Sequence, residues 1–422
     1  MKIVKGLVSG LLAIFLVTDS FGQFQKHTVS PGLVMAGYQG WFNTPTDGAD
    51  RGWHHYERQG RFEPGYCKFD LWPDMAEYEK KYPTPFQFEN GTPATVFSPY
   101  DESTVNLHFK WMKEYGIDGV FMQRFVAEIR SASGKKHFNK VLLSAAKAAL
   151  QYDRTIAVMY DLSGMNSGDV EVLVNDWKEL MGTTHFTDRS HHSNYLANEG
   201  KPVIAIWGVG FDDGRKYTLD DIERLIKFFK SEEGGNCSIL LGVPTYWREQ
   251  GRDCIDDKKF LDVIQMADII HPWFVGRFNE EGYDRFKPII GNDLAWCQSH
   301  EKKYMPVVFP GFSWNNMLPP DRPSSTIPRN NGSFLWKQLQ GATSQGAQMI
   351  YVAMFDEIDE GTAIFKIARD VPVGKSKFVA LEEGLPADYY LWLTGEAARM
   401  MKEGIQLPMI RPATNSRQRL LK

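Results

Sequence analysis

Short apolar segments alternate with amphipathic segments along most of the chain. Each short segment is a near-continuous apolar run bounded by glycine, proline or polar residues, a pattern typical of strands covered on both faces of a parallel sheet. Eight such segments span residues 33–38, 117–123, 155–161, 202–207, 238–243, 268–273, 305–310 and 348–355. Apolar side chains at helical spacing predict helices over residues 105–115, 138–150, 170–180, 219–230, 258–266, 283–301, 334–344 and 389–403.

This strand–helix alternation predicts an α/β fold built from right-handed β–α–β units. Eight units favour a closed (β/α)8 TIM barrel in a single domain. An open doubly wound sheet is the alternative. The connection over residues 39–103 is long and rich in Pro, Gly, Trp and Tyr. In a barrel it would leave the C-terminal rim, where active sites lie. We expect residues 23–405 to form the domain and residues 406–422 a surface tail.

The N-terminus has the layout of a secretory signal. Lys2 and Lys5 precede an apolar run over residues 6–17, and the small residues Ser20 and Gly22 follow it. We expect a signal peptide over residues 1–22 and a secreted or periplasmic protein. No later segment has the apolar length of a membrane span. The net charge of −4 lies in no long block of one sign, so a nucleic-acid partner is not expected. We expect a monomer without a cofactor.

The cysteines do not define a metal knuckle or a disulfide scaffold. The four are far apart, at Cys67, Cys237, Cys254 and Cys297, and none forms a Cys-x-x-Cys pair. The cysteines could form one or two disulfides or stay buried as free thiols, and both possibilities remain open.

Four carboxylates follow the most apolar of the predicted strands. Asp356, Glu357, Asp359 and Glu360 occupy the turn after residues 348–355. Like charges at this spacing raise one another's pKa, so that one carboxyl can stay protonated beside an ionised one. Glycosidic cleavage requires such a pair, and the end of the eighth barrel strand is where a barrel places its chemistry. A solvated acidic loop or a cation site is the plainer interpretation of the same cluster.

Further candidates lie at other predicted strand ends and in the long first loop. In a closed barrel the first strand is next to the eighth, so residues that follow it can face the acidic cluster. The alternative for the aromatic residues is a plug that caps the barrel. The predicted substrate-binding residues are Tyr38, Trp41, Trp53, His54, His55, Gln123, Arg124, Asp161, Trp207, His271, Trp273, Trp314, Asp356 and Asp359. The adjacent histidines of the pair His54–His55 should point apart, so a metal site is not expected there.

The acidic segment resembles a family signature. Phe355-Asp356-Glu357-Ile358-Asp359-Glu360-Gly361-Thr362 is similar to the Phe-Asn-Glu-Trp-His-Glu-Gly-Thr signature of glycoside hydrolase family 99, the endo-α-mannosidases, and to the related α-1,3-glucanases of family 71. Weaker similarities occur in the same order along the chain: residues 37–42 resemble a Tyr-Tyr-Pro-Trp-Tyr block, 53–56 a Trp-x-His-Trp, 116–120 a Gly-Ile-Asp-Gly-Phe strand and 310–312 a Pro-Gly-Tyr.

The resemblance implies a (β/α)8 retaining α-glycosidase without a metal. It implies that Glu357 takes the proton of the sugar 2-hydroxyl, giving a 1,2-anhydro intermediate, and that Glu360 acts as acid and then as base. It also implies a sugar contact for Tyr38. Asp356, Ile358 and Asp359 replace the Asn, Trp and His of the signature, and Gln123-Arg124 stands where the family has Ser-Trp.

The sequence thus favours a secreted glycoside hydrolase acting on an α-linked glycan. Two alternatives stay open. One is a barrel that binds carbohydrate without cleaving it. The other is a metal-dependent hydrolase that uses Asp356, Glu357, Asp359 and Asp161.

Overall fold

The computed structural model describes residues 25–188, 190–318, 322 and 325–413. The predicted signal peptide and the end of the predicted tail, residues 414–422, lie outside the described residues. Within them, no helix has the length and apolar character needed to cross a membrane.

Nine short strands form a parallel sheet in the order β10-β9-β8-β7-β5-β4-β1-β14-β11. Their bounds agree with the predicted apolar runs to within a few residues, except at the seventh run. The strands are β1 (Val34–Tyr38), β4 (Gly119–Phe125), β5 (Thr155–Asp161), β7 (Lys201–Trp207), β8 (Ser238–Val243), β9 (Ile269–Pro272), β10 (Lys303–Tyr304), β11 (Val307–Val308) and β14 (Ile350–Val352).

The seventh strand closes the barrel in two pieces. β10 pairs with β9, while β11 pairs with β14 at the other end of the sheet. Between them, the Met305 amide donates to the Ile270 carbonyl at 2.9 Å, and the Pro306 carbonyl accepts from the Tyr351 amide at 3.0 Å. The single predicted run over 305–310 is therefore wrong, because Pro306 has no N–H to donate to a ladder.

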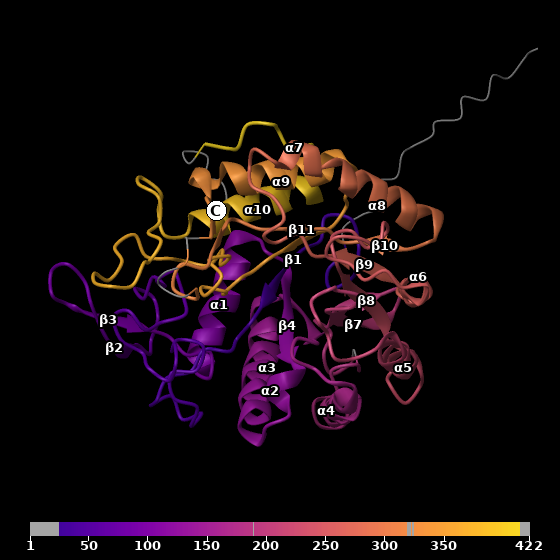
Figure 1. Ribbon diagram of the computed structural model, residues 1–422, viewed down its shortest axis with the longest axis horizontal. Helices are drawn as coiled ribbons and strands as arrows, with labels where there is room; N and C mark the ends of the chain where they lie inside the picture. The colour runs from indigo at the N-terminus through magenta and orange to yellow at the C-terminus, as the bar shows by residue number, and fades with distance from the viewer. Residues whose placement is uncertain (1–24, 189, 319–321, 323–324, 414–422) are drawn as a thin grey trace, which may run out of the picture.

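A helix follows each barrel strand and packs outside the sheet (Figure 1). The fold is a (β/α)8 TIM barrel, and the open doubly wound sheet is wrong. The outer helices are α1 (Glu102–Tyr115), α3 (Ala132–Tyr152), α4 (Val170–Thr184), α5 (Leu219–Lys230), α6 (Lys258–Gln265), α7 (Tyr283–Phe286), α8 (Pro288–Ser299), α9 (Ser333–Ser344) and α10 (Tyr389–Lys402). The predicted helix over 283–301 is split into α7 and α8 before Pro288.

The pleat of the strands decides which side chains face the barrel interior. In β1, Gly37 faces inward, since a Cβ there would lie within 2.4 Å of Met354 and of the Tyr351 hydroxyl. Tyr38, the next residue, faces outward and hydrogen-bonds to His108 of α1. The same alternation in β4 turns Gln123 inward and Arg124 outward.

The long first loop folds on itself beside the barrel. It carries the hairpin of β2 (Tyr82–Gln87) and β3 (Pro93–Val96), labelled at the left of Figure 1. A cluster of aromatic rings with centroids 4.6–6.2 Å apart fills its interior, comprising Trp53, Tyr56, Phe62, Phe69, Trp72, Phe86 and Phe378. The four cysteines are buried free thiols, so no disulfide joins them.

Candidate active site

The acidic turn lies buried at the C-terminal mouth of the barrel. Only 0%, 4% and 2% of the surfaces of Asp356, Glu357 and Asp359 are exposed, and Glu360 is half-buried. Burying four carboxyls together is costly unless they are hydrogen-bonded or keep their protons. The surroundings of each carboxyl show which of these applies.

Asp356 ties the acidic turn to the end of β1. Its two oxygens accept from the backbone amides of Gln39 and Gly40, at 2.8 and 2.9 Å. Burial raises the pKa of Asp356 to about 7, and the two amide hydrogen bonds oppose that rise. With both oxygens used by the backbone, Asp356 anchors the turn.

Glu357 receives one donor on each oxygen. The Gln39 side-chain amide donates to Oε1 and the Thr362 hydroxyl to Oε2, both at 2.8 Å. Burial raises the pKa of Glu357 well above its usual range, and the charges of Glu360 and Asp359 raise it further. The two donors act in the opposite direction, because they stabilise the ionised form.

Burial raises the pKa of Glu360 to about 8, and the charge of Asp359 adds to the rise. The Trp314 indole lies close enough to lower this pKa in part, although its Nε1 has no hydrogen bond of good geometry among the described residues. Glu357 and Glu360 are therefore two coupled carboxyls that cannot both ionise cheaply at neutral pH. The fixed donors on Glu357 offset only part of the rise in its pKa. Glu360, with its pKa raised to about 8, carries a proton at neutral pH.

Asp359 completes the cluster beside His55. Its Oδ2 lies 3.5 Å from His55 Nδ1, and burial raises its pKa to about 7. His55 stacks on Trp41, with ring centroids 3.8 Å apart. Burial lowers the pKa of His55 well below its usual range, so this imidazole is neutral at physiological pH.

Several buried polar atoms around the mouth have no hydrogen-bond partner within the described part of the chain. Buried polar groups are nearly always paired in folded proteins, so a group of unpaired ones marks a place where a polar ligand or water completes them. They include both donors and acceptors, as a polyol requires. These atoms are Gln39 Oε1, Trp41 Nε1, Gln123 Oε1, Trp207 Nε1, His271 Nε2, Trp314 Nε1 and Asp359 Oδ1.

Ring contacts and charges connect these groups across the barrel. The His271 ring lies 4.4 Å from that of Tyr351 on β14, and Trp207 packs edge-on against Trp273 at 5.1 Å. The charge of Asp161, at the end of β5, raises the pKa of Glu360. Aromatic faces, unpaired polar atoms and two coupled carboxyls thus share one mouth.

No protein-family model matches the chain, and no curated protein matches its sequence. Among solved structures, the chain matches two of an endo-α-mannosidase of glycoside hydrolase family 99 from Bacteroides thetaiotaomicron, each with a TM-score of 0.60. One of the two is a complex with bis-tris-propane. They are 16% identical to the chain and cover 88% of it and 98% of their own length. The chain has the fold of the family 99 endo-α-mannosidases.

A glycoside hydrolase-like protein also matches, with a TM-score of 0.50 and 14% identity. The match covers 78% of this chain and 94% of that protein. At these identities the likeness to family 99 concerns the fold, so the assignment of residues depends on where this chain places them.

The barrel brings most of the predicted residues to its mouth. These are Trp41, His55, Gln123, Asp161, Trp207, His271, Trp273, Trp314, Asp356 and Asp359, together with the predicted pair Glu357 and Glu360. Gln123, Asp161, Trp207 and His271 belong to β4, β5, β7 and β9, and the others come after the C-terminal ends of β1, β9, β11 and β14. Substrate contact by each of them remains a prediction.

Two predicted residues face away from the mouth. Tyr38 is fully buried, and its hydroxyl lies 2.8 Å from His108 Nδ1 on α1. Arg124 is equally buried and donates through Nε and Nη2 to Asp176 on α4, at 2.8 and 2.5 Å. Both lie between the sheet and the helices, because they alternate with the inward-facing Gly37 and Gln123. Their expected sugar contacts are corrected to packing roles.

Two residues of the long loop take part in its own packing instead. Trp53 belongs to the aromatic cluster, with its ring 4.6 Å from that of Phe62. His54 Nε2 lies 2.6 Å from Arg51 Nη2 and 3.3 Å from a Glu128 oxygen. Within the described residues, neither makes a hydrogen bond, an ion pair or a ring contact with Glu357 or Glu360.

The expectation that His54 and His55 point apart is wrong. His55 has φ of 61°, a left-handed conformation that departs from the alternation of a regular strand. As a result, nitrogens of both rings and a Glu128 oxygen lie within 4.8 Å of one another, the one convergent set of metal-type ligands among the described residues. The Arg51 guanidinium, ion-paired to Glu128, occupies this site as a cation. Asp356, Glu357, Asp359 and Asp161 form no comparable set within the described chain.

Sequence reasoning did not single out Gln39 and Thr362, which hold Glu357. Gln39 lies two residues after Gly37, so the strand alternation that turns Gly37 inward could have identified it. Thr362 makes a contact within its own turn, and nothing in its local pattern distinguishes it.

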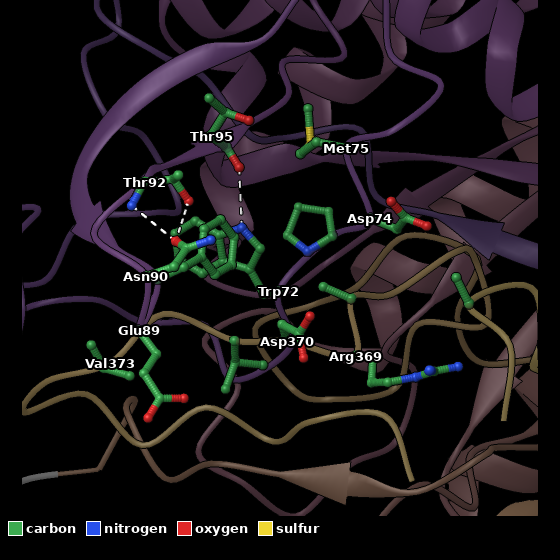
Figure 2. A pocket seen from close by; sticks show the side chains of 15 residues that line it. Trp72, Asp74, Met75, Glu89, Asn90, Thr92, Thr95, Arg369, Asp370 and Val373 are labelled. Carbon is green, nitrogen blue, oxygen red and sulfur yellow. Dashed lines mark hydrogen bonds between the residues drawn. The ribbon is translucent and has the colours of Figure 1, made fainter. Parts of the chain in front are cut away.

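A large pocket lies elsewhere, between the β2–β3 hairpin and residues 368–373 (Figure 2). It has a volume of about 980 Å³ and exposes Asp74, Glu89 and Asp370 against a single cation, Arg369. None of its described lining atoms is a buried polar atom without a partner. The unpaired atoms thus favour the barrel mouth over this pocket as the site of chemistry.

Proposed function

We propose that the protein is a secreted glycoside hydrolase that cleaves an α-linked glycan with retention of configuration. The observation that carries this proposal is the coupled pair Glu357–Glu360, buried at the barrel mouth among unpaired donors and acceptors. The fold shared with family 99 and the signature-like segment at residues 355–362 support it. Export rests on the N-terminal pattern of charged, apolar and small residues.

In the first step, Glu357 takes the proton of the sugar 2-hydroxyl. The freed oxygen attacks the anomeric carbon, the glycosidic bond breaks, and Glu360 gives its proton to the departing oxygen. In the second step, Glu360 takes a proton from water as the water opens the anhydro ring, and Glu357 returns its proton to the 2-oxygen. Each acid thus ends where it began.

The environments of the two acids suit these roles. Gln39 and Thr362 hold both oxygens of Glu357 and stabilise its charge, as a base requires. Glu360 is half-buried with its pKa near 8, so it carries a proton at neutral pH and remains accessible to a leaving group. The neutral indoles and amides of the mouth can pair with sugar hydroxyls without adding charge.

The test is a screen of α-linked gluco- and manno-oligosaccharides with the purified mature protein and two variants. Glu360→Gln should reduce turnover of any substrate by at least about 10³-fold, since the acid is lost. Glu396→Gln is the matched control, because Glu396 is a buried glutamate of α10 that pairs with Arg399. It should retain activity.

Turnover that persists in Glu360→Gln would overturn the assignment of the acid. Binding of a glycan by the wild type without turnover over long incubation would favour the carbohydrate-binding barrel instead. Loss of activity on chelation, restored by a divalent metal, would favour the metal-dependent hydrolase.

A further inference from the structure

A second pocket of about 370 Å³ lies beside the barrel mouth. It is formed by Arg130 after β4, residues 163–166 after β5 and residues 213–216 after β7, and is called here the basic pocket. Because β4, β5 and β7 are neighbours in the parallel sheet, all three loops leave at the end that carries Glu357 and Glu360.

The basic pocket is connected to the acid pair through the end of β5. Asp161 accepts from the Ser163 amide at 2.7 Å, and Ser163 lines the pocket. The charge of Arg215, another lining residue, lowers the pKa of Asp161, while the charge of Asp161 raises that of Glu360. The basic pocket therefore lies at the same end of the barrel as the acid pair, next to Asp161.

Positively charged side chains outnumber carboxylates in the lining of the basic pocket, although the whole chain has a net charge of −4. Arg130, Arg215 and Lys216 line it together with one carboxylate, Asp213. Arg130 donates to the Gly164 carbonyl at 2.7 Å and lies 3.3 Å from Asp169, outside the lining. Arg215 donates to Asp213 at 2.8 Å. Lys216 is exposed and forms no ion pair with any described carboxylate.

Arg215 also extends an aromatic surface of the mouth. Its guanidinium carbon lies 5.5 Å from the Trp207 ring centre and 5.2 Å from that of Phe211. Trp207 Nε1 is one of the unpaired donors of the mouth. The guanidinium thus lies over the Trp207 ring, and stacking on aromatic faces holds it in a fixed orientation beside the mouth.

We propose that the basic pocket binds an anionic substituent, a sulfate ester or a carboxylate, of the glycan cleaved at Glu357 and Glu360. The inference rests on the proposed function and adds the substrate class. Arg215 and Lys216 supply charge-assisted donors, which bind sulfate and carboxylate oxygens more strongly than neutral donors do. The acidic pocket of Figure 2 would repel the same group.

The test measures binding by titration calorimetry in the Glu360→Gln variant, so that turnover does not interfere. The probes are neutral α-1,3-linked gluco- and manno-oligosaccharides, their 6-sulfated forms and their uronate counterparts. We expect one anionic class to bind at least about tenfold more tightly than its neutral form in 20 mM salt, and this preference to shrink in 0.5 M salt. The sulfated and uronate probes distinguish the two sources of charge.

Lys216→Glu should reduce the preference for the anionic probe to within about twofold and leave the affinity for the neutral probe unchanged. Lys216→Ala should give a smaller loss in the same direction. Arg285→Glu is the matched control, because Arg285 is an exposed arginine in a different pocket, on the loops after β8 and β9. It makes the same change in net charge and should leave the preference intact.

Equal affinity for neutral and anionic probes would overturn the inference, as would an unchanged preference in Lys216→Glu or an equal loss in Arg285→Glu. The proposed function would survive each of these results if the wild type still cleaved a neutral glycan. If the wild type neither cleaved nor bound any probe, the proposed function itself would fail.

Discussion

At the residue scale, the charge of the buried Glu357 carboxylate depends on hydrogen bonds from Gln39 and Thr362. Gln39 spans two acids, since its backbone amide holds Asp356 and its side-chain amide holds Glu357. Burial alone would protonate Glu357 and disable it as a base. The two donors on Glu357 offset part of that effect, and the proposed role of Glu357 as the base depends on them.

Gln39→Ala should lower activity and move the acidic limb of the pH–rate profile toward higher pH. The variant loses a donor to the charged form of Glu357, an interaction worth about 1.5–3 kcal/mol, or about 1–2 pH units. Thr362→Val removes the other donor and should act in the same direction. The measurement is kcat/KM against pH; an acidic limb that stays in place in both variants would contradict these roles.

The alkaline limb should report Glu360. The acid works in its protonated form, and its pKa is raised to about 8. Activity should therefore hold up to about pH 8 and then fall about tenfold per pH unit. A profile of kcat/KM over pH 6–10, which reports the free enzyme, checks this, and activity that keeps rising to pH 10 would exclude Glu360 as the acid.

At the element scale, one buried polar link joins two strands to a helix. Asp176 of α4 accepts from Arg124 of β4 and, at 2.6 Å, from the Tyr160 hydroxyl of β5. These groups lie outside the barrel wall, between the sheet and α4. They fix α4 against β4 and β5 and so hold Asp161, at the end of β5, and the loop after it that lines the basic pocket.

Arg124→Met should destabilise the protein by about 3–5 kcal/mol, because it leaves the Asp176 carboxylate buried without its main partner. Urea unfolding measures this loss. The folded fraction should keep the wild-type KM, since Arg124 does not face the mouth. A raised KM with unchanged stability would instead restore Arg124 as a substrate-binding residue. The double variant Arg124→Met/Asp176→Asn should recover part of the stability.

At the scale of the whole molecule, the buried carboxyls and histidines make stability depend on pH. Asp356 and Asp359, with pKa values raised to about 7, and Glu360, at about 8, keep protons in the folded state that they lose when the chain unfolds. Their contribution to stability is present at low pH and is lost as pH rises through these values. Burial lowers the pKa of His108 and His137 to about 3 and of His271 to about 4, which favours the fold as pH rises toward 6.5.

Above about pH 7 the histidines are mostly neutral in both states. The carboxyls then dominate, joined near pH 8.5 by the buried thiols, whose raised pKa also lowers stability as pH rises. We expect Tm to fall by about 3–5 °C between pH 6.5 and 8.5. Glu360→Gln should reduce this fall, since it removes one of the three carboxyls whose ionisation destabilises the fold. Calorimetry across this range measures both. A Tm that rises over the same interval would show that the carboxyls are not held protonated.

The amino-acid sequence by itself determined the barrel, its strand order and the position of the acidic turn. These features depend on local periodicity, on the handedness of β–α–β units and on chain order. The apolar runs at 155–161 and 238–243 coincide with β5 and β8 because continuous burial on both faces leaves a strong local signal.

Only the tertiary structure decided which neighbours of a strand end face the mouth. The pairs Tyr38–Gln39 and Gln123–Arg124 are each adjacent in the chain, and no local pattern separates their members. The pleat turns Gln39 and Gln123 toward the mouth, and Tyr38 and Arg124 toward the helices. The contact of Gln39 with Glu357 joins residues 318 positions apart, and no local pattern encodes it. Barrel closure brings the first and eighth strands together, and with them the groups that set each carboxyl's charge.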